Sequence, residues 1–336
     1  MNNLKNSSPG FDNIPMTIIK CILPTILKPL KHIIICSFNR GIFPDKLKIG
    51  KVLPLFKSGD RCQIGNFRPV SVLVTFSKII EKIICNRFTE FLTENNIINN
   101  SQYGFMKNKS TESATIDFTN NILNAFDSNK FTLGIFLDLS KAFDTVSHPI
   151  LMCKLEHYGI RGKLYDWFSS YLTNRTQFVY FDNHNISSSS SINYGVPQGS
   201  ILGPILFLIY INDIVNSSKL NFIAYADDTC TFSSGSSIRN LINMANDELI
   251  SINKWIILNK LTLNLAKTHY IIFHRNKRMP ALLPDIKLGD SLIKRELSTK
   301  FLGLYLDSRL TWKSHINHIQ SKINKQCGLM YIQSKH

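Results

Sequence analysis

The segment Leu220–Phe232 (LNFIAYADDTCTF) constrains the fold more than any other part of the chain. Apolar residues stand on both sides of the acidic pair Asp227-Asp228, a pattern that predicts two strands joined by a hairpin turn. A second mostly apolar stretch, Thr132–Leu139, predicts another strand, and Asp138 lies near its end. An acid in a turn is a weak sign of chemistry by itself, because Asp favours turns. Acids at the ends of two buried strands nevertheless raise the question of a shared site.

Helical patterns surround these strands, so the chain is predicted to be an α+β protein. Pro24 and Pro29 each remove a backbone donor, which predicts two short helices within Ile14–Phe38. Pro54 makes Lys51–Phe56 an edge-type strand. Further helices are expected over Phe76–Leu92, Thr111–Phe126, Ser147–Tyr171, Gly199–Asp213 and Ser237–Leu258 and from Trp312 onward. Hairpins are expected at Gln177–Tyr194, Thr268–His274 and Ile286–Leu306.

Composition indicates a folded, basic protein. The 336 residues are 44% hydrophobic and 18% charged, enough to bury a large core in one lobed unit or two to three subdomains. The formal net charge of +16 favours a polyanionic partner, and charge alone leaves nucleic acid and an anionic membrane surface both open. The longest apolar run, Ile201–Ile211, is too short to span a bilayer, and no secretory signal begins the chain. The cysteines form no C-x-x-C pair, so neither a zinc site nor a disulfide framework is expected. An intracellular protein without a membrane role fits these features best.

The three acids suit one particular chemistry. Joining a 3′-hydroxyl to a nucleotide α-phosphate uses two metal ions, one at the attacking oxygen and one at the leaving group. Such hard cations prefer carboxylate oxygens. Asp138, Asp227 and Asp228 could supply those oxygens from adjacent strands of one sheet.

Three motifs follow one another along the chain: Phe136–Asp144 (FLDLSKAFD), Tyr194–Pro204 (YGVPQGSILGP) and Phe222–Thr229 (FIAYADDT). In this order they resemble reverse transcriptases, most closely those of jockey-like non-LTR retrotransposons. The resemblance runs from about Ser8 to about Ile323. Tyr225–Asp228 matches the YxDD turn of that family, and Pro197–Ser200 matches its nucleotide and template contact segment.

The resemblance implies a metal site. It makes Asp138 and Asp227 direct ligands, Asp228 a supporting third acid and the Leu139 carbonyl a further ligand. The implied cofactor is a pair of Mg²⁺ ions, with Mn²⁺ as the alternative.

The resemblance also implies nucleotide-binding residues. Arg68, with Lys57 before it, would grip the incoming triphosphate, since cationic groups neutralise phosphate oxygens. Phe143 would pack against the sugar and exclude a 2′-hydroxyl, which favours deoxynucleotides. Gln198 and Gly199 would face the nucleotide or template, and the small Gly199 allows close approach. A turn lysine in solvent and a core phenylalanine are the plainer explanations of Lys57 and Phe143.

Two C-terminal segments complete the implied site. Leu261–Thr268 resembles the segment whose lysine protonates the departing pyrophosphate, which assigns that role to Lys267; a surface lysine is the alternative. Phe301–Leu306 resembles the primer-gripping hairpin, which assigns primer contact to Phe301, Leu302 and Gly303. The thumb would begin near Leu310.

As a whole, the resemblance implies a right-hand polymerase with helical fingers, a palm with an antiparallel sheet, and a truncated thumb. The expected division is residues 1–50 as a helical extension, 51–130 as fingers, 131–300 as palm with some fingers elements, and 301–336 as primer grip and thumb. The expected function is RNA-directed DNA synthesis on an RNA template, with a DNA primer and deoxynucleoside triphosphates, in the nucleus. The chain is expected to be a fragment of a longer polyprotein. A remnant that only binds nucleic acid and an RNA-dependent RNA polymerase are the alternatives, and Phe143 and Pro197–Ser200 disfavour the latter.

Overall fold

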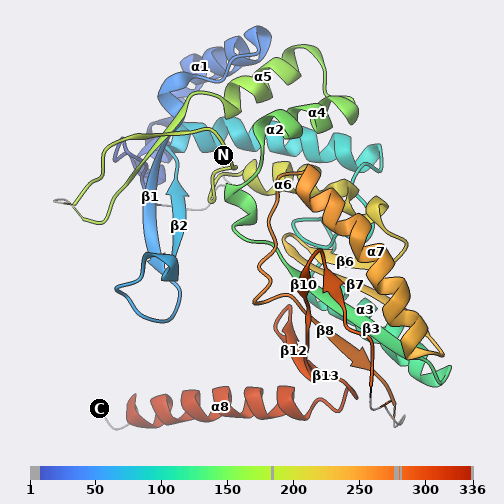
Figure 1. Cartoon of the computed structure of the whole chain (residues 1–336). Coiled ribbons are helices and arrows are strands. Elements are labelled where there is room, and N and C mark those ends of the chain that lie inside the picture. The colour runs from blue at the N-terminus through green and yellow to red at the C-terminus, as the bar shows by residue number, and fades with distance from the viewer. Residues whose placement is uncertain (1–7, 183–184, 276–279, 281, 334–336) are drawn as a thin grey trace. The chain divides into compact units, whose positions relative to one another are not determined.

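The computed structural model describes residues 8–182, 185–275, 280 and 282–333, and its elements are labelled in Figure 1. Two compact units make up the chain. The first unit contains Met1–Asn99, Lys141–Asn212 and Asn259–Leu261. The second unit contains Asn100–Ser140, Asp213–Leu258 and Thr262–His336. These units are defined by packing, so the functional boundaries expected at residues 50, 130 and 300 stay a prediction.

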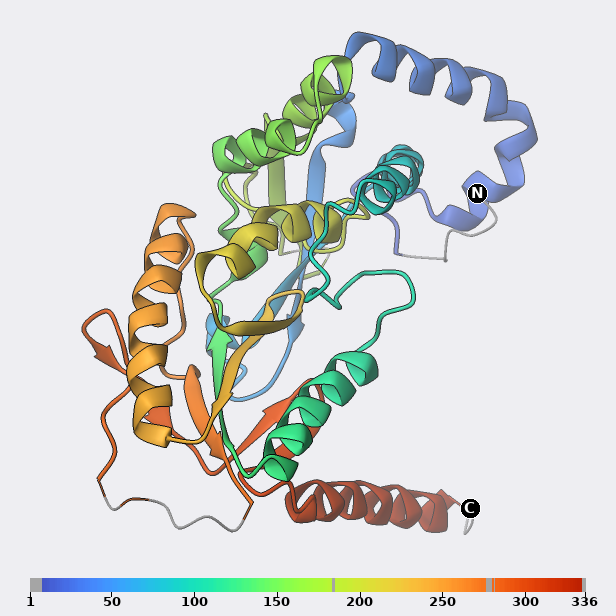
Figure 2. The same ribbon diagram turned by 90° about the vertical axis from the view of Figure 1, so that its right-hand side faces the viewer.

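A five-stranded sheet forms the centre of the second unit. In sheet order its strands are β11 (Lys294–Arg295), β8 (His269–Phe273), β3 (Phe131–Asp138), β7 (Asp228–Gly235) and β6 (Asn221–Tyr225). Helices α3 (Thr111–Asp127) and α7 (Ile238–Leu258) cover its opposite faces (Figures 1 and 2). Both faces of β3 are therefore covered, and all its residues except Asp138 are buried. The predicted strand at Thr132–Leu139, the hairpin at Leu220–Phe232 and both helices are confirmed.

An aromatic cluster joins α3 to the sheet. The ring of Phe118, fully buried in α3, meets four other rings edge-on, with centroids 5.3–5.9 Å away. Those rings belong to Phe136, Phe232, Phe273 and Phe301. Edge-to-face pairs of this kind add roughly 0.5–1.5 kcal/mol each beyond area burial. The cluster holds the end of β3 at a fixed position.

The second unit also contains two small hairpins and the last helix. The hairpins are β9 (Lys287–Leu288) with β10 (Ser291–Leu292), and β12 (Ser298–Phe301) with β13 (Leu304–Asp307). Helix α8 (Lys313–Gln333) follows them. The predicted hairpin at Thr268–His274 is wrong, because β8 is one continuous strand between β3 and β11. Its residues from Tyr270 to Phe273 are all buried, and no turn residue interrupts them.

The first unit contains a four-stranded sheet with helices. In sheet order the strands are β2 (Phe67–Val72), β1 (Ile49–Phe56), β4 (Arg175–Val179) and β5 (Ser190–Ile192). The helices are α1 (Met16–Arg40), α2 (Thr75–Glu94), α4 (His148–His157), α5 (Gly162–Leu172) and α6 (Gly203–Ile211). The prediction of an edge strand at Lys51–Phe56 is wrong, since β1 pairs with both β2 and β4. Pairing with β4 stops at Val52, so Pro54 lies beyond it and needs no donor on that side.

The expected pair of short helices near the N-terminus is a single helix. α1 continues through Pro24 and Pro29, and Figure 2 shows it bent. Both prolines are exposed, so the carbonyl groups that lose a donor can bind water. Ile19 and Leu30, on either side of the prolines, pack in one apolar cluster with Ile79 of α2. Burial on both sides therefore keeps the helix continuous.

The longest apolar run of the sequence forms a core helix. All residues of α6 except Pro204 are buried, so the run fills the interior of the first unit. Among the residues that the structure describes, no helix has the length and apolar character needed to cross a membrane.

Candidate active site

The three predicted acids lie where strand β3 ends and strand β7 begins, and they form what is called the acidic edge of the five-stranded sheet. β3 ends at Asp138 and β7 begins at Asp228, and these two residues are direct partners in the antiparallel pairing. Asp227 precedes β7 in the turn from β6. Like charges opposite one another on neighbouring strands repel. A cation at this edge would relieve that repulsion, and carboxylate oxygens are suitable donors for a hard divalent ion.

The carboxylates do not converge on one point in this structure. Within the described residues, no group of three His, Cys, Asp or Glu side chains is arranged to hold a metal ion. The carboxylate of Asp138 instead faces Lys267, with Oδ2 and Nζ 3.8 Å apart. The Lys267 side chain is 61% exposed and that of Asp138 35%, so solvent screens this pair strongly. The donor set fits a divalent ion, and the ammonium of Lys267 faces part of that set in this structure.

Backbone hydrogen bonds hold the chain at Leu139, the residue after Asp138. Leu139 forms an isolated antiparallel bridge with Leu263. The Ser140 amide donates to the Thr262 carbonyl at 2.8 Å, and the Asn264 amide donates to the Asp138 carbonyl at 2.8 Å. These bonds use the groups on either side of the Leu139 carbonyl and fix the backbone just after β3.

A cleft of about 460 Å³ lies beside the acidic edge, within the second unit. Its polar lining includes Asp138, Asp228, Lys267, His269, Lys294 and Lys300. His269 joins two walls: its Nδ1 lies 2.7 Å from the Lys267 carbonyl and its Nε2 2.7 Å from the Thr299 hydroxyl. A carbonyl can only accept, so Nδ1 carries the proton and Nε2 can accept from Thr299. The histidine thus ties β8 to β12.

The hairpin with the predicted primer grip lies at the same cleft. Leu302 and Gly303 form the turn between β12 and β13, with φ of 47° and 96°. Positive φ at both central residues is typical of a tight hairpin turn. Phe301 is buried in the aromatic cluster with Phe118, so its side chain supports the hairpin from inside. Gly303 is exposed and Leu302 partly so.

In the first unit, three predicted residues belong to one connected structure. The Phe143 ring stacks on Phe207 of α6, with centroids 4.3 Å apart. The Gln198 side chain donates to Asp144, next to Phe143, at 2.9 Å. Gly199 has a φ of +114°, and a Cβ there would lie 2.5 Å from the Ser71 carbonyl oxygen. The segment therefore requires glycine at 199.

The remaining predicted residues lie on the β1–β2 hairpin. Arg68 is exposed on β2, opposite Leu55 of β1. Lys57 is exposed just after β1, and its amide donates to the Asn66 carbonyl at 2.9 Å. Both cations belong to the first unit, whereas the acids and Lys267 belong to the second.

Comparison with known proteins decides the family. Residues 56–306 match the family described as reverse transcriptase (RNA-dependent DNA polymerase), a range that includes the acidic edge and Pro197–Ser200. This chain belongs to the reverse transcriptase family.

Relatives and solved structures agree with this assignment. The RNA-directed DNA polymerase from mobile element jockey of Drosophila melanogaster is 28% identical over 96% of this chain, and the match covers 36% of that protein. A probable RNA-directed DNA polymerase from transposon BS of the same organism is 29% identical over 92% of this chain and 35% of its own length. The chain therefore spans about a third of these curated relatives. The predicted resemblance to jockey-like elements is confirmed.

The fold agrees as well. The structure of apo telomerase from Candida tropicalis matches with a TM-score of 0.54 over 86% of this chain and 59% of that one, at 14% identity. A telomerase structure from Candida albicans matches with a TM-score of 0.52 over 79% of this chain and 47% of that one, at 16% identity. The predicted α+β polymerase fold is confirmed by this likeness.

Sequence reasoning missed a buried charge pair in this chain. Glu81 of α2 is fully buried and accepts hydrogen bonds from the Ile201 and Leu202 amides, at 2.8 and 3.3 Å, at the start of α6. Burial raises the pKa of its carboxyl, and the charge of the buried Arg175 opposes that rise. A signal was present, because Glu81 shares the apolar face of its helix with Ile84 and Phe88. Arg175 at the start of a strand gave none.

Proposed function

We propose that this chain is the polymerase part of a reverse transcriptase and transfers deoxynucleotides to a DNA primer on an RNA template. The observation that carries the proposal is the pairing of Asp138 with Asp228, beside Asp227, within the range matched by the family. Asp138, Asp227, Asp228 and the Leu139 carbonyl would hold two Mg²⁺ ions. When bound, the ions supply activation of the 3′-hydroxyl and stabilisation of the leaving pyrophosphate.

Side chains near the acids would handle charge and protons. Lys267 is close enough to Asp138 to reach the same phosphate groups, and its ammonium can donate a proton to the departing pyrophosphate. Arg68 and Lys57 are exposed cations that would bind the triphosphate. Gln198 would contact the nucleotide or template from its place beside Phe143.

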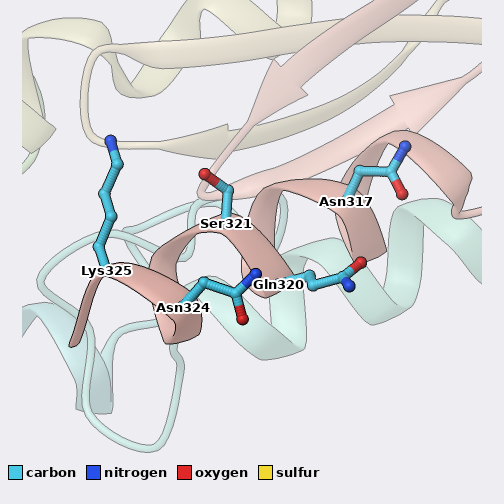
Figure 3. Close-up of a pocket in the computed structure, with 5 residues that line it drawn as sticks. All are labelled: Asn317, Gln320, Ser321, Asn324 and Lys325. Carbon is cyan, nitrogen blue, oxygen red and sulfur yellow. The ribbon is translucent and has the colours of Figure 1, made fainter. Parts of the chain in front are cut away.

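The last helix supports a nucleic-acid partner. Figure 3 shows polar side chains from successive turns of α8, and they line a shallow pocket: Asn317, Gln320, Ser321, Asn324 and Lys325. The helix sequence, Lys313–Gln333, contains no Asp or Glu. Amide, hydroxyl and ammonium groups are the side chains that most often contact phosphate and sugar. We infer that this face follows the backbone of the template and primer.

Primer extension tests the proposed function. Wild-type protein is expected to extend a DNA primer on RNA with Mg²⁺ and deoxynucleotides, and Asp227→Ala is expected to lose that extension. Asp290→Ala is the matched control, because Asp290 is an acid at another hairpin turn in the second unit. Template binding without extension in the wild-type protein would support the remnant that only binds nucleic acid. Extension unaffected by Asp227→Ala would refute the catalytic assignment.

Sugar selection is a separate prediction. Phe143→Val should lower the preference for deoxynucleotides over ribonucleotides by roughly ten- to a hundredfold, since a smaller side chain leaves room for the 2′-hydroxyl. The measurement is the ratio of kcat/KM for single incorporation of each nucleotide, from which any loss of folded enzyme cancels. An unchanged ratio would assign Phe143 to the core alone, through its stacking on Phe207.

A further inference from the structure

A short segment before α3 lies against the strand that leads into the acidic turn. Gln102 forms a parallel bridge with Ala224 of β6. The Ala224 amide donates to the Ser101 carbonyl at 2.9 Å, and the Tyr103 amide donates to the Ala224 carbonyl at 2.7 Å. β6 is the last strand of its sheet, so this segment pairs with its outer edge.

The side chain of Gln102 reaches past β6 into the turn. Its Oε1 accepts hydrogen bonds from the amides of Ala226, at 2.9 Å, and Gly104, at 2.8 Å. Both partners are N–H donors, so the amide oxygen and not the nitrogen must face them. Gln102 is only 6% exposed, and both bonds are shielded from water.

The turn needs this support. Ala226 has a φ of 56°, a left-handed conformation that is unfavourable for residues with a Cβ. It is 5% exposed, so its amide would be buried without a partner if Gln102 did not accept from it. Gly104 allows the approach, since a Cβ there would lie 2.3 Å from the Ala226 nitrogen.

The segment itself is firmly held. The Lys109 ammonium donates to the carbonyls of Asn100 and Gln102, at 2.6 and 2.9 Å. It also lies over the Tyr103 ring, 4.8 Å from the centroid, and the Tyr103 hydroxyl donates to Asp117 of α3. Gln102 is therefore a fixed acceptor rather than a mobile surface amide.

Ala226 directly precedes Asp227, so this contact fixes the Tyr225–Ala226 peptide, one residue before Asp227. We propose that Gln102 is a positioning residue that holds the backbone of the acidic turn so that Asp227 can bind its metal ion. The proposal rests on the proposed function of the same site.

Gln102→Met tests this inference, since methionine keeps the length and bulk of the side chain and removes the acceptor. Backbone hydrogen exchange should become at least tenfold faster at the Ala226 amide. Binding of Mn²⁺ to the protein, followed by its electron paramagnetic resonance signal, should weaken several-fold. The rate constant of nucleotide addition should fall on the order of tenfold to hundredfold, as expected for a displaced catalytic group. Gln102→Asn, whose amide is one carbon short, should give the same pattern if the methionine variant fails to fold.

A second substitution separates positioning from loss of structure. Glycine adopts positive φ without strain, so Ala226→Gly in the Gln102→Met background should recover part of the lost Mn²⁺ affinity and rate. Gln177→Met, on β4 of the first unit, is the matched control and should change none of these readouts.

The outcomes distinguish this inference from the proposed function. Unchanged exchange at Ala226 in Gln102→Met would refute the hydrogen bond. Faster exchange with unchanged Mn²⁺ binding and rate would refute the positioning role alone. Absence of Asp227-dependent extension in the wild-type protein would refute the proposed function, whereas the exchange result would still report on the Gln102 contact.

Discussion

Asp138→Asn is expected to reduce DNA synthesis by on the order of a thousandfold or more while template binding stays within about twofold. The amide matches the carboxylate in shape but lacks the charge that would bind the metal ions. Metal ions stabilise the transition state by several kcal/mol. Asp138 stands opposite Asp228 at the sheet edge, so its loss removes one side of the proposed site. Single-turnover extension and fluorescence anisotropy with labelled RNA–DNA measure the two quantities on the same protein.

Stability should change little in this variant. The pair between Asp138 and Lys267 is long and solvent-screened, so its loss is expected to cost less than about 1 kcal/mol. The control is Asp290→Asn, which changes an exposed turn acid of the same unit. Retained synthesis in Asp138→Asn would contradict the metal assignment, and a parallel loss of template binding would show that the effect is not confined to chemistry.

Strands and helices with uniform patterns could be predicted from the sequence. β3 and β6 are mostly apolar, β7 alternates threonine with apolar residues from Thr229 to Phe232, and α2 and α3 have clear helical periods. Predictions from the preferences of single residues failed where tertiary contacts determined the secondary structure. Pro24 and Pro29 did not break α1, because packing on α2 holds both halves and the proline side faces solvent.

The acids could be predicted as a set because their order and spacing resemble a known family. The contacts that support the acids could not be predicted from the sequence. Gln102 and Ala226 are far apart in sequence, and a side-chain bond to a backbone amide leaves no periodic pattern. The bond from Gln198 to Asp144 is of the same kind. Such contacts depend on the folded chain and are found only in its structure.

Arg175→Met is expected to lower the free energy of unfolding by about 3–5 kcal/mol at pH 8, because it leaves a buried carboxylate without its opposing charge. Arg175 is 1% exposed, its Nη1 donates to the Tyr171 carbonyl at 3.1 Å, and its guanidinium lies 4.8 Å from the Tyr171 ring centroid. Its charge lowers the pKa of Glu81 against the stronger effect of burial, which raises it. Urea unfolding at several pH values measures the loss.

The pH dependence of the free energy of unfolding identifies which of the two charges remains without its partner. Without Arg175 the folded-state pKa of Glu81 should rise further above its unfolded value, near 4.3. The folded protein then binds a proton more tightly than the unfolded chain, so the deficit of Arg175→Met should shrink as pH falls from 8 toward 5. Glu81→Gln leaves Arg175 instead, and a guanidinium cannot lose its proton in this range. Its deficit relative to the wild-type protein should grow as pH falls from 8 toward 5, because only the wild-type protein keeps Glu81, whose raised folded-state pKa stabilises the fold as the carboxyl gains a proton.

A double variant separates the effect of the two charges from the effect of packing. Glu81→Gln with Arg175→Met removes both charges, and glutamine keeps an oxygen for the Ile201 amide at the start of α6. Since Nε and Nη2 of Arg175 have no hydrogen-bond partner within the described residues, replacing the pair should recover most of the stability lost in either single variant. Lys163→Met, which breaks the exposed pair with Asp166, is the control and should cost less than about 1 kcal/mol. Additive losses in the double variant would mean that the two side chains act through packing, and that the start of α6 is not held by their charges.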